Sequence, residues 1–419
     1  MTRLALALPL CLALVACGDI HHDQSTMGET TGSTDTSAET DAGTDTDADT
    51  DTDTDTGALE PAGPDHAPDP SLLGPYPVGV RTIALTDPSR GDMEPRPIVT
   101  EVWYPATDAA LDGEGVVYTI NDLLRPDAVA LLSEPVDASF TTTAVRDAPV
   151  RGDDGPYPVV LFSHGSGGVR MQSTYFTVAL ASHGYVVLAP DHYGNTLSDI
   201  IVDGDLTDTA LFESLGDRPL DLDFLVDYLE TLDVDDPLAG SYDLARLGVS
   251  GHSFGALTSV RWMGMGAPVS AVVAQAPPAY DLAWLSLDGS LADFDTPLML
   301  HVGGMDQTTP PSDANSIWVE ATPPRARMTL QNAGHFTFSD LCQLDAEAIA
   351  EATDLGVIDA LGDGCDAVNT PPEVATAVIR YFGIGHFNRY LRDSTPTAAL
   401  LTQEAGRALG GDEVTYESE

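Results

Sequence analysis

The feature that most constrains the fold is an alternation of short apolar runs with longer stretches of helical periodicity. The apolar runs are three to six residues long and lie at 159–163, 185–189, 247–249, 269–274, 298–302 and 327–330. The helical patterns lie at 171–182, 218–232, 254–263 and 373–382. Short apolar strands joined by helices are typical of a mostly parallel sheet with helices on both faces, so we expect an α/β fold.

The region before this alternation has a different pattern. Apolar runs at 78–85 and 98–103 flank a polar stretch with turn residues, which predicts an antiparallel β-hairpin at the N-terminal edge of the sheet. Residues 105–150 are less regular, and we expect an insertion there with a small helix near 120–132. A second insertion is expected near 193–216. We expect residues 71–419 to form a single domain.

The first 16 residues read as an export signal, with Arg3 ahead of an apolar stretch at 4–16. That stretch is too short to span a bilayer, which needs roughly 20 apolar residues. It is followed by Cys17 and Gly18, and the sequence Leu-Val-Ala-Cys resembles the lipobox of bacterial lipoproteins. This resemblance implies cleavage before Cys17, lipidation of that residue, and a protein exported and anchored to a bacterial membrane, on the periplasmic side or at the cell surface.

Residues 17–70 are rich in Thr, Asp, Gly, Ser and Pro and hold almost no large apolar side chain. Such a segment cannot bury a core, so we expect a disordered acidic tether about 40 Å long. The Asp-Thr alternation at 45–55 lacks the glycine and the final glutamate of a calcium-binding loop. The sequence therefore favours a solvated tether over a calcium site.

The charge excludes several functions. The chain has 17 basic and 66 acidic residues, a net charge of −49, and every base is Arg. Without Lys, a Schiff base and a P-loop lysine are both excluded. A strongly acidic surface would repel nucleic acid, which we do not expect as a partner.

The pattern Gly251-His252-Ser253-Phe254-Gly255 matches G-x-S-x-G, with an expected strand before it and an expected helix after it. In that context the serine occupies a strained turn that exposes its hydroxyl, and the glycines let neighbouring backbone approach. Ser253 is therefore predicted to be a nucleophile. His252 is more typical of structural packing than of a substrate contact.

A nucleophilic serine needs a base and an orienting carboxylate, which in this chain order follow as acid and then histidine. Asp306 comes just after the run at 298–302, and His335 just after the run at 327–330. Carboxyl ends of parallel strands meet at one edge of a sheet, so the two should be brought together. His301 lies within an expected strand and is typical of a core residue, and His386 is expected to lie beyond the closing helix.

Two backbone N–H groups are needed to bind a developing oxyanion. The residue after the nucleophile, Phe254, should supply one. The glycine-rich turn after the run at 159–163 resembles the HGGG-type motif of esterases, and Ser166 is the expected second donor. No G-x-G-x-x-G spacing and no lysine accompany this turn, which disfavours a phosphate-binding loop.

Five motifs together resemble the platelet-activating-factor acetylhydrolase-like branch of the α/β-hydrolase superfamily, whose bacterial members are often labelled dienelactone-hydrolase-like and whose relatives include polyester hydrolases. They lie at 76–80, 101–105, 162–165, 181–185 and 251–255, and the resemblance covers roughly residues 76–340. It implies an α/β-hydrolase fold and an ester-hydrolysing activity.

The chain departs from that family in two ways. Dienelactone hydrolases use a Cys nucleophile, whereas this motif has Ser253. In the acetylhydrolase the acid follows the strand just after the nucleophile helix, where this chain has no acid until Asp281. Asp281 is therefore an alternative to Asp306, although Pro277 and Pro278 stiffen its approach.

The sequence thus predicts an extracytoplasmic serine hydrolase of carboxylic esters that needs no metal or organic cofactor, takes a small-molecule or lipid ester, and touches the membrane only through its N-terminal lipid. The alternatives are a lipase or phospholipase with a lid in one insertion, and a non-catalytic binding protein on the same fold.

Cys342 and Cys365 remain after Cys11 and Cys17 are assigned, and in an exported protein they are expected to form a disulfide that restrains the loop of His335.

Overall fold

The computed structural model describes residues 69–419 apart from 91–94, 133–138, 205–206, 280–290 and 344–361. The expected export signal, Cys17, nearly all of the tether and Asp281 lie outside the described residues. Among the described residues, no helix is both long enough and apolar enough to cross a bilayer.

The alternating region forms the parallel centre of the sheet, as the sequence predicts. Its strands are β5 (Tyr157–Ser163), β6 (Val186–Pro190), β7 (Tyr242–His252), β8 (Ala271–Gln275), β9 (Leu298–Gly303) and β10 (Arg325–Leu330). The eleven described strands have the order β11-β10-β9-β8-β7-β5-β6-β2-β1-β4-β3. Neighbouring strands from β6 through β5 to β10 are all parallel, so their carboxyl ends share one edge.

The expected hairpin is present, as β1 (Val78–Asp87) paired antiparallel with β2 (Arg96–Pro105). It is not the edge of the sheet, because the insertion after it contributes β3 (Gly115–Thr119) and β4 (Ser139–Arg146) beyond β1. The insertion also holds the short helices α1 (Ile120–Leu123) and α2 (Pro126–Val129) where one was expected. Strand β4 is rich in threonine and buries only one face, so it forms no continuous apolar run in the sequence.

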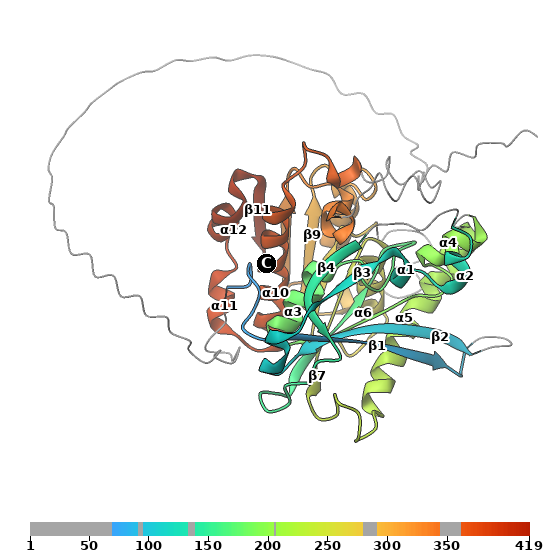
Figure 1. Cartoon of the computed structure of the whole chain (residues 1–419). Coiled ribbons are helices and arrows are strands. Elements are labelled where there is room, and N and C mark those ends of the chain that lie inside the picture. Colours follow the sequence, from blue (N-terminus) through green and yellow to red (C-terminus); the bar gives the residue numbers. More distant parts are fainter. Residues whose placement is uncertain (1–68, 91–94, 133–138, 205–206, 280–290, 344–361) are drawn as a thin grey trace, which may run out of the picture. The chain divides into compact units, whose positions relative to one another are not determined.

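Helices cover both faces of the sheet because its central strands are apolar on both sides. In β5, Val160 and Phe162 pack in one core with α3 (Thr174–Ser182) and α10 (Pro372–Leu391), which contact each other (Figure 1). Val159 and Leu161 face the opposite core. That core holds α5 (Asp208–Glu230), α6 (Phe254–Gly264) and α7 (Pro311–Glu320).

Several elements extend past their expected bounds. Helix α5 begins at Asp208, so together with α4 (Leu197–Asp203) it converts the insertion expected near 193–216 largely into helix. Helix α10 continues to Leu391, and His386 therefore lies inside it rather than beyond it, buried against the sheet. The chain then forms α11 (Thr395–Leu400), α12 (Gln403–Gly410) and β11 (Val414–Ser418), which pairs antiparallel with β10.

Candidate active site

Ser253 lies in a sharp turn between β7 and α6. Its backbone has φ 58° and ψ −123°, a conformation that a residue with a side chain rarely adopts. Such strain persists only where the surrounding structure enforces it, and it is common at functional sites. The turn has the geometry expected of a nucleophile elbow at the carboxyl end of a parallel strand.

The glycines on either side of Ser253 are required by close approach of the backbone. A Cβ on Gly255 would lie 1.9 Å from the carbonyl oxygen of Ser163, and a Cβ on Gly251 would lie 2.4 Å from the backbone of Gly255. Both distances are far inside van der Waals contact. Strand β5 and the first turn of α6 can therefore pack against the elbow only because these positions lack side chains.

The structure brings Asp306 and His335 together at the same edge of the sheet. Asp306 follows β9 and His335 follows β10; both are buried, and His335 Nδ1 lies 3.0 Å from Asp306 Oδ2. Asp306 also accepts hydrogen bonds from the backbone N–H of Thr309 at 2.7 Å and from its hydroxyl at 2.9 Å. These contacts fix the carboxylate and direct it to one nitrogen of the imidazole.

A second carboxylate, Asp363, holds the loops of Asp306 and His335 from the outside. It accepts from the backbone N–H groups of Gln307, Thr308 and His335 at 2.9 to 3.2 Å. Two residues later, Cys365 is disulfide-bonded to Cys342, with 5.0 Å between their Cα atoms. No local motif marks Asp363, so its role could not be predicted from the sequence.

The glycine-rich loop (residues 164–168) lies directly beside Ser253. A Cβ on Gly165 would be 3.4 Å from Ser253 Cβ, so the peptide that joins Gly165 to Ser166 is next to Ser253. The N–H of Gly165 is already bonded to Gln172 Oε1 at 2.9 Å, whereas that of Ser166 has no acceptor among the described residues. Phe254 is the first residue of α6, where backbone N–H groups have no partner within the helix.

Gln172 and His252 connect the glycine-rich loop to the loop of His335. Gln172 Nε2 donates to His252 Nδ1 at 2.7 Å, and His252 Nε2 donates to the carbonyl oxygen of His335 at 3.0 Å. Burial holds the pKa of His252 well below its usual range, which keeps it neutral and able to both accept and donate. His252 thus has the packing role that the sequence favoured, while Gln172 was missed.

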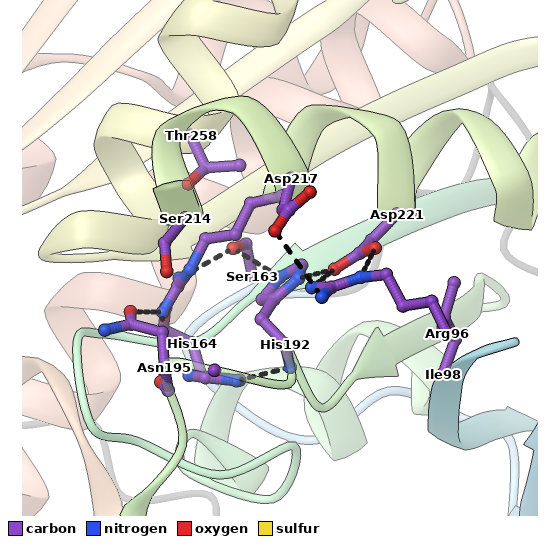
Figure 2. Close-up of polar contacts among 12 residues, drawn as sticks. Arg96, Ile98, Ser163, His164, His192, Asn195, Ser214, Asp217, Asp221 and Thr258 are labelled. Carbon is purple, nitrogen blue, oxygen red and sulfur yellow. Dashed lines mark hydrogen bonds and ion pairs between the residues drawn. The ribbon is translucent and has the colours of Figure 1, made fainter. Parts of the chain in front are cut away.

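A buried polar cluster lies beneath the glycine-rich loop (Figure 2). Ser163 Oγ donates to His192 Nε2 at 2.9 Å, and His192 Nδ1 donates to Asp221 Oδ2 at 2.8 Å. Asp221 also pairs with Arg96 and Arg90 at 2.6 to 2.7 Å. Burial opposes ionisation of Asp221, but the hydrogen bonds from Arg96 and His192 prevail and lower its pKa.

This cluster repeats the order serine, histidine, acid, but it is closed to substrate. The side chains of Ser163, His192 and Asp221 are all fully buried. Burial lowers the pKa of His192 to about 4, so its ring is neutral at neutral pH. We assign the cluster a structural role beneath Ser253. Within the described residues, no group of three or more His, Cys, Asp or Glu side chains is arranged to hold a metal ion.

Two protein-family models match the chain. The model described as "Platelet-activating factor acetylhydrolase, isoform II" matches residues 70–202, and the model of the dienelactone hydrolase family matches residues 146–341. Together they span the sheet from its hairpin to the loop of His335.

Individual relatives are more distant. The chain is 24% identical to cutinase est1 of Thermobifida alba over 187 residues, which is 44% of this chain and 55% of that cutinase. The matched stretch thus spans about half of that curated relative. A ferulic acid esterase from Streptomyces cinnamoneus has a similar solved structure, with a TM-score of 0.58 and 23% identity over 82% of this chain and 97% of that one.

The sheet order, the elbow at the end of β7 and the two overlapping family matches agree with one another. The chain has an α/β-hydrolase fold, and it is similar to the platelet-activating factor acetylhydrolases over its first part and to the dienelactone hydrolase family over its middle part.

Proposed function

We propose that the chain is a serine hydrolase that cleaves carboxylic esters through an acyl-enzyme intermediate. Ser253 is the nucleophile, His335 the base, and Asp306 the acid that orients it. The observation that carries the proposal is the 3.0 Å contact between His335 Nδ1 and Asp306 Oδ2, at the sheet edge where the strained Ser253 follows β7. A protein that only binds a ligand has no need of all three.

The steps follow from these positions. Ser253 Oγ attacks the acyl carbon while His335 Nε2 takes its proton, because Nδ1 is engaged by Asp306. The tetrahedral oxyanion is stabilised by the N–H groups of Ser166 and Phe254. Collapse expels the alcohol, which takes the proton from His335. Water then repeats the sequence on the acyl-enzyme and releases the acid.

Carboxylic esters are the favoured substrate class because the chain is similar to a cutinase and to a ferulic acid esterase. The test is hydrolysis of p-nitrophenyl esters from acetate to palmitate by the wild-type protein and by Ser253→Ala, together with labelling by a fluorophosphonate probe. We expect ester turnover and a single adduct on Ser253, both lost in the variant. Folded wild-type protein that forms no adduct on Ser253 would refute the proposal.

We further propose that the protein is exported and anchored by lipid on Cys17. The support is the lipobox-like sequence before Cys17, together with the disulfide between Cys342 and Cys365, a bond typical of oxidising compartments. In a host that processes lipoproteins, Cys17→Ser should move the protein from the membrane fraction to the soluble fraction, whereas Cys11→Ser should not. Equal fractionation of the two variants would contradict the anchor.

A further inference from the structure

Arg218 is a buried guanidinium directly beneath the glycine-rich loop. It comes from α5 and its side chain is fully buried. One terminal nitrogen donates to the carbonyl oxygen of His164. The other donates to the carbonyl oxygen of Gly165 at 3.1 Å and to the side-chain oxygen of Asn195. Its hydrogen bonds are therefore directed mainly at the loop that lies beside Ser253.

The charge of Arg218 has no carboxylate in contact with it among the described residues. Two acids lie near Arg218 along the helix, and both are paired elsewhere. Asp217 pairs with Arg90 and Arg96, and Asp221 is bonded to the same two arginines and to His192. Burial of a cation without an ion pair is expensive, and it lowers the pKa of Arg218 to about 9. The hydrogen bonds to His164, Gly165 and Asn195 are what hold this cation in the interior, so its position is tied to the glycine-rich loop.

The geometry of one peptide links Arg218 to the oxyanion. The carbonyl oxygen of Gly165 and the N–H of Ser166 belong to the same peptide group, which is trans. In a trans peptide these two groups point in opposite directions. A guanidinium on the carbonyl side therefore fixes the direction of the Ser166 N–H on the other side. Its positive charge also polarises the peptide and strengthens that N–H as a donor.

Arg218 touches the second donor residue as well. Its guanidinium carbon lies 4.8 Å from the centroid of the Phe254 ring, within the range of a cation–π contact. The Gly165–Ser166 peptide, through its carbonyl oxygen, and the ring of Phe254 thus both contact one buried cation. No other described arginine has contacts to both the glycine-rich loop and the first residue of α6.

We propose that Arg218 is a positioning residue of the oxyanion hole: it holds the Gly165–Ser166 peptide and Phe254 in place and supplies a fixed positive charge behind them. This inference rests on the proposed ester hydrolysis by Ser253. It acts on the transition state, because negative charge develops on the substrate oxygen only there. Loss of Arg218 should therefore lower kcat and leave KM nearly unchanged.

The test compares Arg218→Gln and Arg218→Lys with the wild-type protein in hydrolysis of p-nitrophenyl acetate. Arg392→Gln is a matched control, because Arg392 also donates to a backbone carbonyl, that of Gly184, and also lies over an aromatic ring, that of Tyr185. Removal of one oxyanion donor typically lowers kcat by about 10²- to 10³-fold. For the indirect role of Arg218 we expect about 10- to 100-fold in Arg218→Gln and a smaller loss in Arg218→Lys, which keeps the charge but not the fork.

A pair of inhibitors separates this role from a loss of folding. A trifluoromethyl ketone forms a tetrahedral oxyanion adduct with a serine, whereas the corresponding secondary alcohol binds without charge. In Arg218→Gln the inhibition constant of the ketone should rise in parallel with the loss of kcat, while that of the alcohol stays constant. In Arg392→Gln both constants and kcat should match the wild type, even if the melting temperature falls.

Three results would overturn the inference. One is a folded Arg218→Gln protein with wild-type kcat, and another is an equal rise of both inhibition constants. If Arg218→Gln does not fold, Arg218→Lys decides the matter, and wild-type kcat in that variant would leave Arg218 only a role in folding. Failure of the proposed function is a separate outcome, seen as no difference between the wild-type protein and Ser253→Ala.

Discussion

Asp306 is the single residue whose assignment most affects the proposed chemistry. Replacing it by Asn would keep the shape but present the wrong hydrogen-bonding group to His335 Nδ1, which lies 3.0 Å away. In a serine triad such a change lowers kcat by about 10⁴-fold while the fold stays intact. We expect that loss for Asp306→Asn in turnover of p-nitrophenyl acetate, with a circular dichroism spectrum like that of the wild type.

Asp281→Asn is the matched control, since Asp281 is the other acid that the sequence allows. We expect it to lower turnover little. Near wild-type turnover by Asp306→Asn together with a large loss in Asp281→Asn would show that the acid had been assigned wrongly.

Gln172 is a residue-scale test of how the site is held together. Gln172→Met keeps much of the side-chain volume but leaves the Gly165 N–H and His252 Nδ1 buried without their partners. Each unpaired buried group costs about 1–3 kcal/mol. We therefore expect urea denaturation to show a clear loss of stability, with a lower kcat because the glycine-rich loop is released.

Gln275→Met is the control for Gln172→Met. Gln275 is also buried, but its Nε2 has no partner within the described residues and its Oε1 accepts only a 3.4 Å bond from Tyr175. Its replacement should be close to neutral. Equal losses in the two variants would mean that the link from Gly165 to His252 has no special part in stability.

Packing around the elbow is tested by two glycines in different surroundings: Gly255 is crowded by backbone, and Gly216 has open space around it. Gly255→Ala would place a methyl group 1.9 Å from the Ser163 carbonyl oxygen, so α6 must move away from β5. We expect more than about 3 kcal/mol of destabilisation and loss of Ser253 labelling. Gly216→Ala, in the exposed part of α5 with open space around its Cβ, should instead stabilise by about 0.5–1 kcal/mol. Thermal melts of the two variants that shift in the same direction would contradict this packing.

The short segment that carries Asp363 is held to the loop of His335 by the disulfide. Closure of a loop of this length stabilises by about 3 kcal/mol in the chain-entropy model. The double variant Cys342→Ser/Cys365→Ser should lose about that much in urea denaturation, and its kcat should fall because Asp363 no longer clamps His335. Asp363→Asn in the intact disulfide background separates the clamp from the bridge. Alkylation of both thiols in unreduced, denatured wild-type protein would refute the bridge itself.

Elements could be predicted from the sequence wherever burial on both faces makes a continuous apolar run, as in β5, β6 and β9. Strands β4 and β11 could not be predicted because each buries one face only and carries polar residues on the other. The start of α5 could not be predicted because its large apolar residue Phe212 is exposed, which interrupts the apolar face of the helix there. The parallel centre of the fold was therefore predictable, and its edges were not.

The residues of the candidate site also divide into those that a local sequence motif marks and those that only the folded structure reveals. Ser253, Asp306 and His335 each stand in a short local pattern after a strand, so their positions could be predicted. Gln172 and Arg218 have no such pattern, because their partners lie elsewhere: His252 is 80 residues from Gln172, and Gly165 is 53 residues from Arg218. Only the folded sheet brings these pairs together.

Buried neutral histidines give the whole molecule a pH dependence. Burial lowers the pKa of His183 and His192 to about 4 and of His301 and His386 to about 3. It also lowers those of His164 and His252 well below the usual range. An unfolded chain titrates its histidines near pH 6.5. As pH falls below 6.5, histidines bind protons in the unfolded state but stay neutral in the folded state, so the free energy of unfolding falls.

Buried acids partly offset the loss of stability that the histidines cause in acid. Burial raises the pKa of Asp340 to about 6, and it also raises that of Asp191. These carboxyls bind protons more readily in the folded state, so they favour folding as pH falls and offset part of the loss. Asp221, whose pKa is lowered, contributes stability that is lost only in strong acid. Because six histidines act in one direction and only two acids in the other, the free energy of unfolding still falls as the pH drops from 6.5 to 4.

The free energy of unfolding in urea should therefore decline steeply from pH 7 to pH 5, by about 1.4 kcal/mol per pH unit for each net proton. His301→Leu is the variant that tests the cause. Neither ring nitrogen of His301 has a partner among the described residues, so leucine should be tolerated at pH 8. Below pH 6 the variant should lose stability less steeply than the wild type, by close to one proton. Equal stability of the wild-type protein at pH 8 and pH 5, or identical slopes for the two proteins, would show that burial of neutral histidine does not govern acid unfolding here.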